Sequence, residues 1–108
     1  MFDLIIRGGR VIDPETAFDA VADVAINDGT IVAIGRVSQP AGRTLDADGL
    51  IVTAGFVDLH GHGQSIPADR MQAFDGVTTS LELEIGVLPV ARWYDEQAHA
   101  GRVLNYGA

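Results

Sequence analysis

The first fifty residues carry short runs in which apolar and polar side chains alternate, the period of a half-buried β-strand. Asn27-Asp28-Gly29 separates two of these runs, and Asp-Gly between apolar runs is a strong hairpin signal. Gly8-Gly9 is typical of a turn, and Pro14 closes the strand that follows it. The strands predicted in this β-rich part cover residues 3–7, 10–13, 21–26, 30–34 and 44–47.

Beyond Gly49 the pattern changes to apolar strands that alternate with helical segments. Because two strands are each followed by a helix, the order predicts parallel strands with right-handed crossovers. We therefore expect a mixed fold, β-rich first and then α/β. The predicted elements are a strand over 50–62, a helix over 68–74, a strand over 77–85, a helix over 89–100 and a strand starting at 102–106.

The second predicted helix is amphipathic. Apolar and large side chains recur at the i, i+3, i+4, i+7 spacing that one helix face requires. Gly101 stands where a helix commonly ends, and Gly76 has the same position after the first helix. The stripe that we expect to be buried comprises Val90, Trp93, Tyr94, Gln97 and Ala98.

Two histidines, His60 and His62, follow an apolar strand and are separated by one glycine. In an extended strand, side chains at i and i+2 project to the same face. Imidazole is the commonest neutral ligand for zinc and related divalent ions. A parallel α/β barrel places its chemistry at the C-terminal ends of such strands. The alternative is a pair of ordinary loop histidines, and His99, in a predicted helix, is not an obvious third ligand.

The next predicted strand carries two carboxylates, Glu82 and Glu84, in alternation with leucine and isoleucine. Carboxylates on a buried parallel strand need a partner. Glu84, nearer the C-terminal end, is predicted to lie beside the histidines, where it ligates or bridges a metal or accepts a proton. Glu82 lies one layer deeper and is expected to support a ligand or a neighbouring strand. An exposed polar strand face is the other interpretation.

Composition narrows the class of partner. The 108 residues include 15 acidic and 7 basic side chains, which gives a formal charge of −8 and argues against nucleic acid or anionic membranes as partners. All the basic residues are arginine, and cysteine is absent, so neither a carboxylated lysine nor a thiolate can serve as a ligand. Neither a secretory signal nor a run long enough to span a membrane is apparent, so we expect a cytoplasmic protein.

Taken together, these segments resemble the N-terminal portion of the amidohydrolase superfamily. The resemblance lies in the first hairpin over 3–14, the second over 26–35, the His-x-His strand over 50–62 and the Gly-Val-Thr-Thr start of the next strand at 76–79. It implies part of a small β-sandwich in residues 1–49. For residues 50–108 it implies the first βαβαβ strands of an incomplete TIM-type barrel.

Within the superfamily, the chain looks most like the D-aminoacylase group, which includes N-acyl-D-glutamate deacylases. Dihydroorotase and hydantoinase relatives, which act on cyclic amides, are close behind. Two departures stand out: Ala54 replaces a proline that is frequent before Gly55-Phe56, and the chain lacks the cysteine that often bridges two metals after the second barrel strand. Glu84 stands nearly at that cysteine position.

The resemblance implies metal-assisted hydrolysis of a small N-acyl amino acid. His60, His62 and Glu84 would be ligands of a divalent ion, most simply zinc, with Asp58 as a supporting acid. Glu84 is also the candidate catalytic residue. The family's remaining ligands and its catalytic aspartate are not among these residues, so the 108-residue segment alone is expected to be inactive and to self-associate. A non-catalytic β-rich interaction module that retains the motif is the competing hypothesis.

Overall fold

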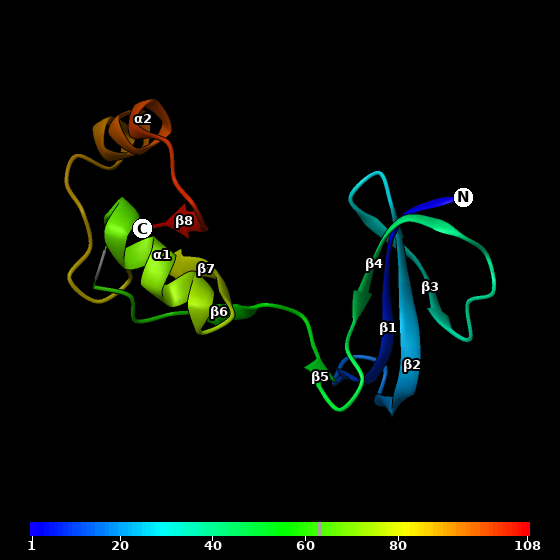
Figure 1. Cartoon of the computed structure of the whole chain (residues 1–108). Coiled ribbons are helices and arrows are strands. Elements are labelled where there is room, and N and C mark those ends of the chain that lie inside the picture. The colour runs from blue at the N-terminus through cyan, green and yellow to red at the C-terminus, as the bar shows by residue number, and fades with distance from the viewer. Residues whose placement is uncertain (63) are drawn as a thin grey trace. The chain divides into compact units, whose positions relative to one another are not determined.

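The computed structural model describes residues 1–62 and 64–108, and these form two compact units, Met1–Ala54 and Gly55–Ala108 (Figure 1). The division falls five residues beyond Gly49, because Ile51 and Val52 pair with the first strand of the chain. Each unit is considered by itself below. Within the described residues, no helix has both the length and the apolar character needed to cross a bilayer.

The first unit is a five-stranded sheet in the order β3-β2-β1-β4, with β5 also paired to β1. The pairs β1–β2 and β2–β3 are antiparallel, whereas β4 and β5 run parallel to β1. The sheet confirms the predicted β-rich first half. Its strands are β1 (Phe2–Asp13), β2 (Phe18–Asn27), β3 (Thr30–Gly35), β4 (Ala41–Asp46) and β5 (Ile51–Val52).

The turn predicted at Gly8-Gly9 is wrong. β1 runs without a break, and the two glycines lie at an irregularity in its pairing with β2, between Ile6 and Gly9. Gly8 has φ +70°, a conformation that a glycine in a bulge supplies at little steric cost. A glycine pair therefore bends one strand here instead of separating two.

The hairpin at Asn27-Asp28-Gly29 is confirmed. Asp28 and Gly29 both have positive φ, +48° and +71°, as a type I′ turn requires. β2, the first arm, buries residues on both faces. Ala25 lies with Ile5 and Val37 in one apolar cluster, and Val24 lies in a second cluster.

The second unit contains three parallel strands in the order β6-β7-β8, and α1 packs against β7 (Figure 1). This arrangement confirms the predicted βαβαβ order. The elements are β6 (Phe56–Asp58), α1 (Ile66–Phe74), β7 (Val77–Leu81), α2 (Val90–Ala100) and β8 (Asn105–Gly107).

Three of the predicted strand extents are wrong. The single strand over 50–62 is two short strands, β5 and β6, in different sheets, and both histidines follow β6. The strand over 77–85 ends at Leu81, so Glu82 and Glu84 lie beyond it. The third strand begins at Asn105. The apolar runs are longer than the strands because alternation continues into the loops that follow them.

The helix ends follow the expected chemistry. Ser65 caps α1 by accepting the N–H of Ala68, Gly76 follows its C-cap with φ +83°, and Gly101 ends α2 with φ +74°. The buried stripe predicted for α2 is wrong, since no residue of this helix is buried. Trp93 is half-buried against Tyr106, and Tyr94 also lies beside that ring but is 38% exposed.

Candidate metal centre

The His60-Gly61-His62 segment begins two residues after β6 and is held by one hydrogen bond to a side chain of β6 and one to the backbone of β7. The His60 N–H donates to Asp58 Oδ1 at 3.0 Å, and the Gly61 N–H donates to the Leu81 carbonyl at 3.1 Å. These bonds turn the chain at the C-terminal ends of two parallel strands. The histidines are therefore placed by a short loop and not by the pleat of a strand.

Gly61 is required by the close approach of this loop to β7. A Cβ atom built on Gly61 would lie 2.3 Å from the hydroxyl of Ser80, a residue with no exposed surface. Any side chain at position 61 would push the loop away from the strand. The glycine between the two histidines therefore sets how closely their imidazoles approach β7.

His60, His62 and Glu84 converge, although neither histidine lies on a strand. Glu84 Oε2 lies 2.6 Å from His60 Nε2 and 2.9 Å from His62 Nε2. The two rings are 4.6 Å apart at nearly a right angle, and one ligand atom from each of the three residues lies within 4.8 Å of the others. A set of two imidazole nitrogens and one carboxylate oxygen is typical of a zinc site.

Glu82 is buried beside this cluster, in contrast to Glu84. Its side chain is 8% exposed, its Oε1 accepts the N–H of Ile85 at 3.2 Å, and its Oε2 lies 3.5 Å from His62 Nδ1. The two nitrogens of His62 thus face different carboxylates. A carboxylate on the Nδ1 side favours the ring orientation that leaves Nε2 toward the cluster.

The cluster itself is open to solvent. The side chains of His60, Glu84 and His62 are 64%, 58% and 44% exposed. This exposure leaves room for an ion and for a substrate at the same edge of the sheet. His99 is exposed on α2 and is not part of the cluster.

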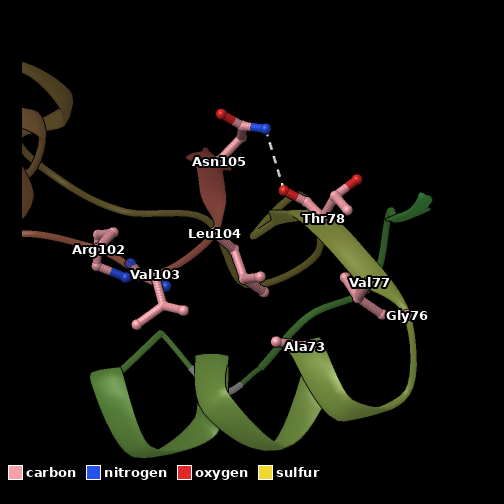
Figure 2. Close-up of a pocket in the computed structure, with 8 residues that line it drawn as sticks. All are labelled: Ala73, Gly76, Val77, Thr78, Arg102, Val103, Leu104 and Asn105. Carbon is pink, nitrogen blue, oxygen red and sulfur yellow. Dashed lines mark hydrogen bonds between the residues drawn. The ribbon is translucent and has the colours of Figure 1, made fainter. Parts of the chain in front are cut away.

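A pocket of about 480 Å³ lies at the other end of the strands (Figure 2). Its lining comes from the start of β7 and the approach to β8, where Asn105 donates to the Thr78 carbonyl at 3.1 Å. None of the metal-cluster residues contributes to it. The pocket and the cluster are therefore separate features of this unit.

Comparison with known proteins places the cluster in a family. The model of the amidohydrolase family matches residues 43–106, which is more than half of the chain. The chain belongs to the amidohydrolase family. The matched range contains both histidines, Asp58, Glu82 and Glu84, so this amidohydrolase segment carries the whole candidate site.

Similar proteins differ in the substrate that their names state. The dihydroorotase of Citrifermentans bemidjiense is 48% identical over 113 residues, covering 95% of this chain and 26% of that protein. The N-acyl-D-glutamate deacylase of Bordetella bronchiseptica, solved with zinc and a phosphonate inhibitor, aligns with a TM-score of 0.78 at 28% identity. The L-hydantoinase of Arthrobacter aurescens also gives 0.78, at 26% identity.

These alignments cover nearly all of the amidohydrolase segment but a minor part of each relative. They include 97% and 98% of this chain, against 28% of the deacylase and 27% of the hydantoinase. The chain thus spans about a quarter of the length of these relatives. The comparisons therefore establish the family.

Sequence reasoning missed two long-range contacts of α1, and the first of them, made by Gln72, supports the site. Gln72 of α1 donates to Asp58 Oδ2 at 3.0 Å and to Ser80 Oγ at 3.4 Å. Arg102 forms a buried ion pair with Asp69, 33 positions earlier. The sequence contained no local signal for either contact, because both depend on how α1 packs.

Proposed function

We propose that this chain is the metal-binding N-terminal portion of an amidohydrolase that hydrolyses an amide bond. The observation that carries the proposal is the convergence of His60 Nε2 and His62 Nε2 on Glu84 Oε2. This convergence lies where the parallel strands β6 and β7 end, which is the edge at which α/β enzymes assemble their sites. The β6-β7-β8 sheet then corresponds to the first strands of a TIM-type barrel, and the first unit to part of a small β-sandwich.

The residues present fit a divalent ion. Two neutral imidazoles and the carboxylate of Glu84 match the number of protein ligands in a catalytic zinc site. The nearby Glu82 adds a second negative charge that favours a dication. When bound, such an ion supplies Lewis acidity and activates water at neutral pH.

The side chains divide the work as follows. His60 and His62 would hold the ion, with their Nε2 atoms facing Glu84, and Glu82 lies on the Nδ1 side of the His62 ring. Asp58 holds the backbone of His60 through its Oδ1. Glu84 is both a ligand and, through its second carboxylate oxygen, the candidate acceptor of a proton.

The substrate we favour is a small N-acyl-D-amino acid of the D-glutamate type. The structural similarity to the Bordetella deacylase over 97% of the chain supports this choice. A cyclic amide is the second candidate, supported by the 48% identity to a dihydroorotase. The remaining alternative, a non-catalytic module, would need no metal.

Metal binding tests the site first. We expect isothermal titration calorimetry of the chain with Zn²⁺ to show binding that is lost in His60→Ala and in His62→Ala. His99→Ala serves as the matched control, because His99 is exposed on α2 and outside the cluster. Equal Zn²⁺ binding by all three variants would refute the proposed centre.

Hydrolysis tests the activity in the longer parent protein that we propose. Release of amino acid from N-acetyl-D-glutamate, lost in His60→Ala, would support deacylation. Ring opening of dihydroorotate with the same dependence would support the second candidate. A metal-loaded parent protein that hydrolyses no amide would favour the non-catalytic module.

A further inference from the structure

Gln72 is the one α1 side chain that reaches the network beneath the histidine loop. Its Nε2 donates to Asp58 Oδ2 at 3.0 Å and to Ser80 Oγ at 3.4 Å. This nitrogen also lies close to the histidine loop, since a Cβ atom built on Gly61 would lie 3.6 Å from it. Gln72 therefore touches the support of the loop and not the cluster itself.

The carboxylate of Asp58 connects Gln72 to the histidine backbone. One oxygen, Oδ2, accepts from Gln72, and the other, Oδ1, accepts the His60 N–H at 3.0 Å. A carboxylate held at both oxygens has one orientation. Loss of the bond from Gln72 frees the carboxylate to rotate and to release the His60 amide.

The oxygen of the Gln72 amide makes this arrangement unfavourable for the stability of the fold. Its Oε1 is buried and accepts no hydrogen bond among the described residues. An unsatisfied buried acceptor destabilises the fold, and an apolar side chain of similar shape would avoid that cost. A purely structural role would favour such an apolar side chain at position 72.

We propose that Gln72 is a positioning residue for the metal ligands, acting through Asp58 to fix the His60-Gly61-His62 segment. The expected effect on metal binding rests on the proposed function. The positioning of the loop rests only on the hydrogen bonds that Gln72 and Asp58 make. Removing the amide eliminates the unpaired Oε1 but also takes a donor from Asp58 and from buried Ser80, so stability should change less than metal affinity.

The test is Gln72→Met, which keeps the length of the side chain and removes the amide. We expect Zn²⁺ affinity, measured by calorimetry, to fall about tenfold, the lower end of the effect of losing such support. Hydrogen exchange at the His60 amide of the metal-free chain should accelerate. The urea midpoint should change little, because one unpaired acceptor is removed while two acceptors lose a donor. Met71→Gln is the matched control, since Met71 is 69% exposed on the same helix.

The outcomes separate this inference from the proposed function. If the wild-type chain binds no Zn²⁺, the metal centre fails, while faster His60 exchange in Gln72→Met at unchanged stability still supports the positioning role. Unchanged exchange together with unchanged Zn²⁺ affinity overturns it. If Gln72→Met lowers the urea midpoint, Gln72→Asn decides in its place, because a shorter amide keeps polarity but cannot reach Asp58.

Discussion

At the scale of single residues, the site depends on the glycine at position 61, which has no side chain. Gly61 lets the histidine loop lie against Ser80, whose hydroxyl would be 2.3 Å from any Cβ at position 61. The two histidines of the His-x-His segment carry the candidate ligand atoms. In this chain the middle position is equally constrained, by packing.

The first prediction is that Gly61→Ala weakens both the fold and the metal site. Overpacking against Ser80 should cost about 1–3 kcal/mol in the free energy of unfolding. Displacement of His60 and His62 should lower Zn²⁺ affinity. Urea unfolding and calorimetry measure the two effects.

A double variant provides the control. Adding Ser80→Gly to Gly61→Ala removes the clashing hydroxyl, so the two changes should be non-additive, as expected for residues in contact. Additive losses in the cycle would show that the clash is not the cause.

The sequence predicted which side chains meet better than it predicted the way they are held. The spacing of His60 and His62 and the position of Glu84 were sufficient to indicate a cluster, although none of the three lies on a strand. Alternating apolar residues after Leu81 imitated a longer strand. Burial of Glu82 and the contact from Gln72 depend on long-range packing, which no local pattern encodes.

At the scale of elements, the β2–β3 hairpin was the part of the fold that the sequence predicted best, because two positive-φ positions leave few residue choices.

The second prediction follows from Gly29. With φ +71° and no atom within 4 Å of a built Cβ, Gly29→Ala meets backbone strain and no clash. We expect a loss of about 1–2 kcal/mol in unfolding free energy. Gly29→Asn should lose less, and equal losses for both variants in urea unfolding would contradict this account.

The elements of the second unit are joined by Arg102, which follows α2. Its guanidinium pairs with Asp69 of α1 and donates to Gln97 of α2 at 2.9 Å. The Arg102 and Asp69 side chains are 2% and 0% exposed. Hydrogen bonds from Arg102, followed by its charge, hold the pKa of Asp69 below its usual value despite burial.

The third prediction is a pH dependence of stability caused by this pair. A carboxyl whose pKa is lower in the folded state stabilises the fold above its unfolded pKa, about 3.9. That stabilisation should be complete at neutral pH and decline as pH falls below about 4. Asp69→Asn should remove this slope and cost about 3–5 kcal/mol at pH 7, because it leaves Arg102 buried and unpaired. Urea unfolding across pH measures both.

A second variant guards against the possibility that Asp69→Asn does not fold. Asp69→Asn combined with Arg102→Met removes both charges and should regain much of the stability. Asp19→Asn, at an exposed pair with Arg10, should leave stability nearly unchanged. A steep acid slope that persists in the double variant would assign the pH dependence to other groups.

At the scale of the whole molecule, each unit leaves apolar surface uncovered. In the second unit, Phe74 and Met71 of α1 are 89% and 69% exposed, and Phe56 of β6 is 60% exposed. On the face of α2 that was predicted to be buried, Val90 and Tyr94 also stay exposed, at 43% and 38%. Among the described residues of the second unit, three strands and two helices give too little cover for the apolar residues that they carry.

The last prediction is self-association of the 108-residue chain through this surface. Exposed apolar patches and the open edges of β6 and β8 favour association, whereas the charge of −8 opposes it by repulsion. Sedimentation should therefore show larger species as protein concentration rises, and added salt should strengthen the effect by screening the charge. Phe74→Ser should shift the distribution toward the monomer, while Asp95→Ser on the exposed side of α2 should not. A chain that remains monomeric at every concentration and salt would contradict the prediction, because repulsion alone could not explain it once the charge is screened.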